Sequence, residues 1–269
     1  MGESERSEVD VVGLRAARET AMDALRSKGL LWPVLDIHGC PRCFSPRRSD
    51  RGVCSTCFEV GLKNPLALDS LEAITVATVT GGLEPILASC KDRPGHRGDV
   101  ALLQLAVPLT AYLERHRDAL ELEVEETLFT AVPSSSNVIA RALSEGVRLG
   151  WFNREIEPTG ESLDPNRRQR HRDKASRQSL THAAWSVEAE RVRNRNVVLL
   201  DDLMTTGASL HSYAKALKLA GARRIRGVVL IRHVSGSVYE EGLEMRRSRG
   251  SEPLWSPDRR WKADLTGLG

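Results

Sequence analysis

Residues 197–209 read VVLLDDLMTTGAS, and this stretch decides the fold class of the 269-residue chain. The four aliphatic residues at 197–200 are typical of a strand that is buried on both faces of a parallel sheet. The small residues that follow predict a tight loop, and residues 209–220 predict a helix that ends at Gly221. A strand, a loop and a helix in this order predict an α/β fold, with a central, mostly parallel sheet flanked by helices.

The same alternation extends over the rest of the second half of the chain. Residues 127–132 predict a short strand, residues 137–149 a helix and residues 227–231 another buried strand. The last thirty residues, which include Trp255 and Trp261, predict a tail with a few docking anchors.

The first half of the chain predicts a different set of elements. Residues 8–28 and 99–118 have the apolar spacing of helices, and Pro108 is expected to kink or divide the second helix. Residues 73–80 alternate as a strand does, and residues 83–91 are expected to return as a second strand after a double-glycine turn.

The polar residues of the 197–209 stretch lie where α/β folds bind their ligands, at the carboxyl end of a strand. The amides and hydroxyls of the loop offer hydrogen-bond donors to a phosphate, and Gly207 lets the ligand approach the backbone. The residues of this loop are Thr205, Thr206, Gly207, Ala208 and Ser209.

The two neighbouring carboxylates, Asp201 and Asp202, have a different role, because negatively charged groups are poor ligands for a phosphate. They suit the vicinal hydroxyls of a ribose and the coordination shell of a Mg²⁺ ion. The stretch therefore predicts a site for a ribose phosphate, with Mg²⁺ as the accompanying cation.

Four of the five cysteines form a second motif, two CxxC pairs separated by ten residues. The pairs are Cys40 with Cys43 and Cys54 with Cys57. Four thiolates on two turns have the number and spacing that a tetrahedral Zn²⁺ needs, and redox-active pairs are the alternative. With all four positions filled by sulfur, the zinc is expected to be structural. The fifth cysteine, Cys90, is expected to be a small buried residue.

Charge and hydropathy exclude several classes of protein. The chain has 39 basic and 36 acidic residues, and its net charge of +3 is too balanced for nucleic-acid binding by bulk charge. No apolar stretch approaches the roughly 20 residues of a membrane helix, and the N-terminus lacks the apolar core of a signal peptide. We therefore expect a cytoplasmic protein without a membrane partner.

The basic excess is local, because residues 165–178 hold six Arg or Lys residues and one Asp. Residues 153–178 contain few apolar residues, so they are expected to form a long mobile loop. A solvated linker and a contact for nucleic-acid phosphates are two interpretations of this loop. Aromatic residues do not alternate with the basic ones, so stacking on bases is not indicated.

The stretch 197–209 resembles, position for position, the phosphoribosyl-pyrophosphate (PRPP) signature of the type I phosphoribosyltransferases. The resemblance implies the type I phosphoribosyltransferase fold. It also implies that Asp201 and Asp202 face the ribose of PRPP and that residues 205–209 bind its 5′-phosphate.

A cysteine-rich segment ahead of such a domain resembles the ComF family, the competence-associated, amidophosphoribosyltransferase-like proteins. Its other motifs are matched at residues 91–95, Val132-Pro133, Arg177-Gln178 and Ala184-Trp185. After Val-Pro the family usually carries basic residues and an Arg-Gly-Phe-Asn-Gln stretch, whereas this chain has Ser134, Ser135 and Ser136. In type I enzymes this loop holds the pyrophosphate through backbone amides, and three serines before a helix still supply such donors.

The same resemblance gives the basic loop a third interpretation, because type I enzymes close a mobile lid between these two motifs. Such a lid brings cations to the departing pyrophosphate as its charge develops. Lys174 and Arg172 are the expected catalytic residues, with Arg170 and Arg168 as further candidates.

The motifs divide the chain into an N-terminal helix (1–37), a zinc-binding segment (38–62), a phosphoribosyltransferase domain (63–235) and a tail (236–269). Two functions remain open. One is a Mg²⁺-dependent enzyme that transfers ribose 5-phosphate from PRPP to a nucleobase or an amine and releases pyrophosphate. The other is a catalytically weak or inactive module that binds PRPP or a nucleotide, as a sensor or as a scaffold for partners in DNA uptake or processing. The family fold also suggests a homodimer.

Overall fold

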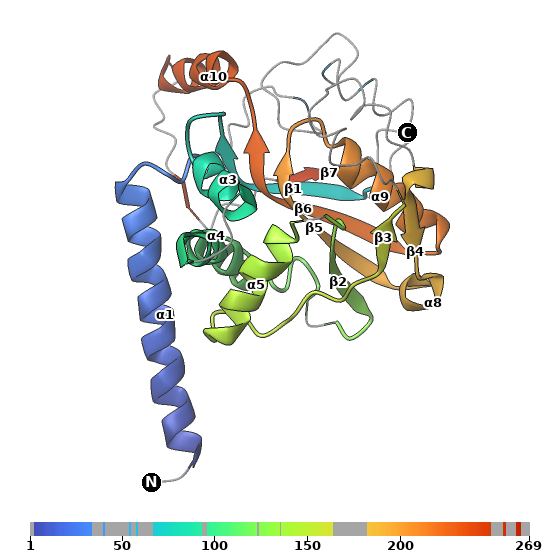
Figure 1. The fold of residues 1–269 in the computed structure, drawn as a ribbon, viewed down its shortest axis with the longest axis horizontal. Helices are drawn as coiled ribbons and strands as arrows, with labels where there is room; N and C mark the ends of the chain where they lie inside the picture. The colour runs from blue at the N-terminus through green and yellow to red at the C-terminus, as the bar shows by residue number, and fades with distance from the viewer. Residues whose placement is uncertain are drawn as a thin grey trace.

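A computed structural model of the chain describes residues 3–33, 40, 54, 58, 67–92, 96–122, 124–134, 136–163, 182–248, 255–256 and 262–264. Its centre is a sheet of five strands in the order β2-β5-β6-β1-β7 (Figure 1). These strands are β2 (Thr127–Ala131), β5 (Asn196–Met204), β6 (Arg224–His233), β1 (Ser70–Ala77) and β7 (Lys262–Asp264). The first four are parallel to one another, and β7 runs antiparallel to β1. The predicted α/β fold with a mostly parallel sheet is confirmed.

Helices cover both faces of this sheet (Figure 1). Side chains of β5 alternate between the faces, so Val198 and Leu200 join one apolar cluster while Val197 and Leu199 join the other. The first cluster includes residues of α1 (Glu3–Ser27), α3 (Glu84–Asp92), α4 (His96–Arg115) and α5 (Val138–Arg148). The second includes residues of α9 (Ala208–Leu219) and α10 (Gly236–Ser248).

Residues 83–91, expected to be a strand, form helix α3 instead. The apolar residues Leu83, Leu87 and Cys90 recur at helical spacing, and all three are buried in the cluster that contains α4. A short run of apolar and polar residues can fit the spacing of a helix as well as that of a strand. Here packing against α4 selects the helix.

Pro108 does not divide the helix that contains it, because α4 is continuous from His96 to Arg115. Both neighbours of Pro108, Val107 and Leu109, are buried, so this part of the helix is held by apolar packing although the proline removes a backbone hydrogen bond. Within the described ranges, none of the helices combines the length and the apolar character that a membrane crossing requires.

The C-terminal part of the chain adds more to the fold than the predicted anchors. Trp255 is buried and donates its indole N–H to the backbone oxygen of Ile74 at 2.9 Å, so it is an anchor as expected. The guanidinium of Arg26 lies 5.3 Å from the centre of the Trp255 ring. Strand β7, which the sequence did not predict, pairs with the edge of β1. Trp261 lies outside the described residues.

A small two-stranded sheet lies against α9, formed by β3 (Gly160–Ser162) and β4 (Trp185–Val187). The 3₁₀ turn η1 (His182–Ala184) precedes β4, and α8 (Ala189–Val192) follows it. The ring of Trp185 packs against Tyr213 at 5.0 Å and donates its N–H to Ser212 at 2.9 Å. The expectation of a continuous loop over 153–178 is therefore wrong for residues 160–162, and residues 164–178 lie outside the described part.

Gly160 is required by the close approach of the two strands of this small sheet. A Cβ atom at this position would lie 2.0 Å from the backbone oxygen of Ser186. Gly160→Ala must therefore separate β3 from β4, and we expect it to lower the free energy of unfolding by about 1–3 kcal/mol. Denaturant unfolding measures the effect. Gly13→Ala is the matched control, because its Cβ would contact nothing within 4 Å in an exposed helix and should be neutral or stabilising.

Candidate functional site

The candidate site lies at the carboxyl ends of two neighbouring parallel strands, β2 and β5. The last residue of β2, Ala131, is paired with Leu200 of β5, and the Val132 N–H donates to the Leu200 oxygen at 2.8 Å. Each strand then leads through a short loop into a helix, α5 after β2 and α9 after β5. Two helix N-termini, both favourable for anions, therefore face the same edge of the sheet.

Strand β5 is longer than expected and carries both carboxylates within it. The alternation of side chains places Asp202 on the face of α3 and α4 and Asp201 on the face of α9. Asp201 is half-buried, and its carboxylate accepts the backbone N–H of Asp202 at 3.0 Å. Asp202 is only 7% exposed. The two acids therefore have different surroundings although they are adjacent.

Lys91, at the end of α3, is a site residue that sequence reasoning did not identify as one. Its Nζ lies 2.9 Å from Oδ2 of Asp202, and the ion pair neutralises a carboxylate that is otherwise almost buried. In the sequence, Lys91 stands out only as part of the 91–95 stretch that resembles the ComF family. The contact depends on the helical conformation of residues 84–92, which the sequence analysis took for a strand.

The loop after β5 turns at a glycine directly before α9. Gly207 has a φ of 75° and directly precedes α9, and the Ala208 N–H donates to Oγ1 of Thr206 at 3.3 Å. A Cβ at Gly207 would lie 3.0 Å from the ring of His211, so both the conformation and the available space favour glycine. Thr205 and Thr206 therefore lie in the turn, Gly207 ends it, and Ala208 and Ser209 are the first two residues of α9.

The loop after β2 is closed by one of the three serines. Oγ of Ser134 accepts the backbone N–H of Asn137 at 3.0 Å. Asn137 has a φ of 45° and precedes the first residue of α5. Ser136 is also described, whereas Ser135 lies outside the described residues. The part that is visible has the form of a turn that leads into a helix N-terminus.

The other residues expected at a site can be placed only in part. Lys174 and Arg172 lie outside the described residues, as do Cys43 and Cys57. Cys40 and Cys54 are both buried in the apolar cluster that contains Leu68. Among the described residues alone, no three His, Cys, Asp or Glu side chains come together as a metal site.

Cys90 lies next to the Lys91–Asp202 pair and is 4% exposed, so it is the buried residue that was expected. Burial raises the pKa of its thiol to about 11, although the nearby charges of Arg141 and Lys91 act in the opposite direction. The thiol is therefore protonated at neutral pH and is a poor nucleophile.

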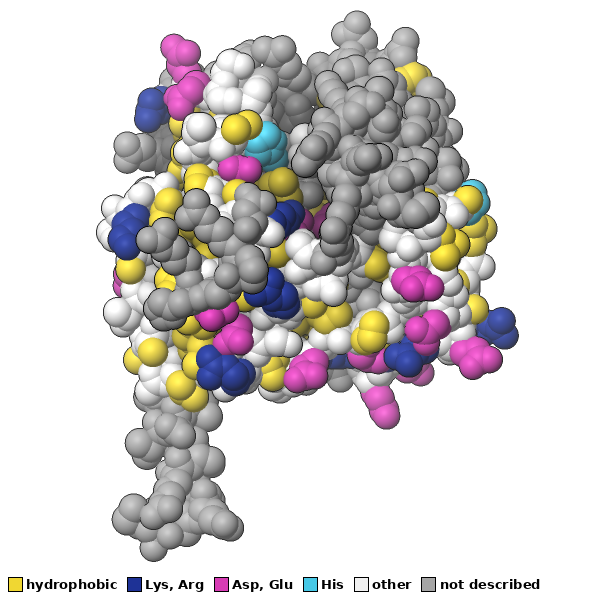
Figure 2. All heavy atoms as spheres, in the orientation of Figure 1, with side chains coloured by type: hydrophobic (Ala, Val, Ile, Leu, Met, Phe, Trp, Pro, Cys, Tyr) yellow, Lys and Arg dark blue, Asp and Glu magenta, His cyan; other side chains and the backbone are white. Residues whose placement is uncertain are grey.

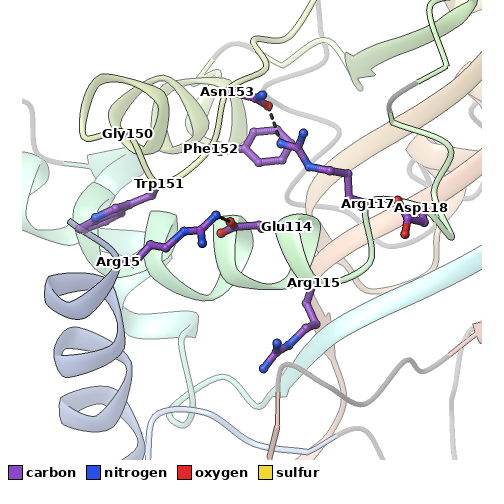
Figure 3. Close-up of a pocket in the computed structure, with 9 residues that line it drawn as sticks. All are labelled: Arg15, Glu114, Arg115, Arg117, Asp118, Gly150, Trp151, Phe152 and Asn153. Carbon is purple, nitrogen blue, oxygen red and sulfur yellow. Dashed lines mark hydrogen bonds and ion pairs between the residues drawn. The ribbon is translucent and has the colours of Figure 1, made fainter. Parts of the chain in front are cut away.

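A cavity of about 560 Å³ lies between α1, the C-terminal end of α4 and the residues that follow α5 (Figure 3). Within it, Arg15 pairs with Glu114 at 2.8 Å, and Arg117 donates to Asn153. Its lining residues come from helices and loops, and not from the carboxyl ends of strands, where α/β folds bind their substrates. The cavity therefore does not compete with the site at Asp201 and Asp202.

Comparison with known families identifies the fold. A model of the phosphoribosyl transferase domain matches residues 110–245, and a search of curated proteins found no match. The matched part contains both loops, Asp201 and Asp202, and it covers half of the chain, so the protein belongs to the phosphoribosyl transferase family. It is thus a glycosyltransferase-type enzyme whose phosphoribosyl donor is PRPP.

The ion pair between Lys91 and Asp202 can be tested by a double-mutant cycle of Lys91→Met and Asp202→Asn. Lys91 is 34% exposed, so we expect a coupling free energy of only about 0.5–1 kcal/mol in denaturant unfolding. The control cycle combines Lys91→Met with Asp69→Asn. Asp69 directly precedes β1 and is paired with Lys218 of α9. That cycle should be additive. Equal coupling in both cycles would contradict a specific pair.

Proposed function

We propose that this protein is a Mg²⁺-dependent phosphoribosyltransferase. It joins the ribose 5-phosphate of PRPP to a nitrogen nucleophile, on a nucleobase or an amine, and releases pyrophosphate. The observation that carries the proposal is that two helix N-termini, those of α5 and α9, follow the carboxyl ends of neighbouring parallel strands, one of which bears Asp201 and Asp202. PRPP has phosphate groups at both ends of a ribose, and two such N-termini near a pair of carboxylates would suit a ligand of this form.

Each part of the site has its own task in this proposal. The amides of residues 205–209 bind the 5′-phosphate, and the turn formed by Ser134, Ser135 and Ser136 binds the pyrophosphate. The carboxylates of Asp201 and Asp202 accept hydrogen bonds from the ribose hydroxyls, which orients the ribose for attack. Lys91 supports this arrangement because it keeps Asp202 in place when no substrate is bound.

The donor set of the site fits a Mg²⁺ ion that arrives with its substrate. Mg²⁺ is usually held by one or two carboxylates together with waters and substrate phosphates, and Asp201 and Asp202 are the carboxylates available here. When bound, the ion supplies positive charge to the leaving pyrophosphate. Asp201, which is the more exposed of the two acids, is the one more open to such an ion.

We further propose that the segment containing Lys174 and Arg172 forms a lid over this site, with these two residues as its catalytic cations. Strands β3 and β4 precede and follow the segment that contains both residues, and they are paired with each other. Trp185 of β4 contacts Tyr213 and Ser212 of α9, the helix that begins at the phosphate-binding turn. The segment therefore starts and ends at a small sheet that contacts α9, the helix that follows the turn.

A sensor or scaffold without catalytic activity is the second candidate function. The observation in its favour is the turn after β2, where Ser134 and Ser136 provide no positive charge and the first basic side chain after the strand is Arg141. A partner in DNA processing belongs to this candidate through the ComF-like resemblance, and the family fold suggests a homodimer for either candidate. On the face seen in Figure 2, acidic and basic side chains of the described residues are interspersed, so this part of the surface does not favour nucleic acid.

Two substitutions test the assignment of the PRPP site. Asp202→Asn removes charge-assisted hydrogen bonds of about 1.5–3 kcal/mol each, so PRPP affinity should fall roughly ten- to a hundredfold. Gly207→Val places a β-branched residue at a φ of 75° and should weaken binding at least as much. Calorimetry with PRPP and Mg²⁺ measures both effects.

The outcomes separate the two candidate functions. Wild-type affinity in both variants would show that PRPP binds elsewhere. If wild type binds PRPP and the variants do not, pyrophosphate release with a series of nucleobases and amines decides between phosphoribosyl transfer and binding alone. Release with one acceptor supports the transferase, and no release with any acceptor supports the sensor.

We also propose that Cys40, Cys43, Cys54 and Cys57 bind one structural Zn²⁺. The burial of Cys40 and Cys54 in a single cluster supports the proposal, because the two come from different CxxC pairs. Elemental analysis should find one zinc per chain in protein purified without chelators. Cys54→Ser should lose the metal and lower the melting temperature, because metal binding is coupled to folding. Cys90→Ser, outside the motif, should keep the zinc, and a metal-free wild type would contradict the proposal.

A further inference from the structure

Arg232 is a buried cation directly behind the phosphate-binding turn. It lies near the end of β6, is paired in register with Met204 of β5, and is only 5% exposed. Its Nη1 donates to the backbone oxygens of Met204 and Thr205, both at 2.7 Å, and also to that of His233. Two of these acceptors are the carbonyls with which the turn begins.

These two hydrogen bonds fix the direction of the amides that follow. In a trans peptide the C=O of one residue and the N–H of the next point in opposite directions. Since the Met204 and Thr205 oxygens point at Arg232, the N–H groups of Thr205 and Thr206 must point away from it. Hydrogen bonds from an ionised donor are strong, and Arg232 therefore holds both peptide planes firmly.

We propose that Arg232 is a positioning residue, which holds the turn 204–207 in the conformation that binds the 5′-phosphate. The inference rests on the proposed function for the identity of the phosphate. Arg232 acts through the backbone and does not contact the ligand. An aliphatic side chain at this position would leave the two carbonyls without the donor and would let the peptide planes rotate.

A role of this kind predicts a selective loss of affinity. The turn after β5 would bind the 5′-phosphate, whereas pyrophosphate would bind the turn after β2, and β5 separates β2 from the strand that carries Arg232. Substitution of Arg232 should therefore weaken ribose 5-phosphate much more than pyrophosphate. A purely structural role would weaken both ligands through general loss of the fold.

The test compares Arg232→Lys and Arg232→Met with wild type, by calorimetry with ribose 5-phosphate and with pyrophosphate plus Mg²⁺. We expect Arg232→Lys to lose about tenfold in affinity for ribose 5-phosphate and Arg232→Met to lose more, with pyrophosphate affinity within twofold of wild type. The matched control is Arg226→Lys. Arg226 lies near the amino end of the same strand and donates to Glu121, so its substitution should leave both affinities unchanged.

Three results would overturn the proposal. They are unchanged ribose 5-phosphate affinity in a folded Arg232 variant, equal loss for both ligands, and an equal effect of Arg226→Lys. If neither Arg232 variant folds, amide NMR of wild type decides: ribose 5-phosphate should shift the Thr205 and Thr206 signals, and unshifted signals reject the role. Failure of wild type to bind PRPP at all would instead reject the proposed function.

Discussion

The parallel pairing of β5 with β2 on one side and β6 on the other is the constraint on which the site depends. Because all three strands run in the same direction, their carboxyl ends meet at one edge of the sheet. Hydrogen bonding fixes the backbone of β5 on both sides up to Leu200, and on the side of β6 as far as Met204. The acids and the turn that follow are held at a defined place by the strongest part of the fold, and not by flexible loops.

The balance of charge at this edge follows from the same arrangement. Two acids project from the end of β5, and two cations reach it from different elements, Lys91 from α3 and Arg232 from β6. Lys91 bonds a carboxylate directly, whereas Arg232 bonds carbonyls and leaves the amides of the turn for a ligand. A site that must hold both a polyanion and a pair of acids needs this separation, because an unshielded carboxylate would repel the phosphates.

How much the sequence could predict depends on whether the deciding interaction is local. The strand and the turn at 197–209 were predicted because their signals lie within one short stretch of the chain. This stretch contains the apolar run, the two acids, the small residues and the glycine, and it forms a single strand-turn-helix unit. Helix α3 was mistaken for a strand because its short sequence fits both a helix and a strand. Packing against α4, which is not visible in the local sequence, selects the helix. The pairs of Lys91 with Asp202 and of Arg232 with Met204 join residues that are far apart in the chain, so no local pattern could reveal them. Strand β7 has three residues, and its described pairing is with β1, which lies far from it in the chain.

The position of β1 has a consequence for how the protein is made. Both neighbours of β1 come from much later in the chain, since Leu71 pairs with Gly227 on one side and with Ala263 on the other. During synthesis on a ribosome, the pairing of this apolar strand with its two sheet neighbours must therefore wait until most of the domain has been translated, whereas its bridge from Val76 to Trp32 can form earlier. Until then the strand lacks both sheet neighbours, and such segments are bound by chaperones or aggregate when chaperones do not bind them.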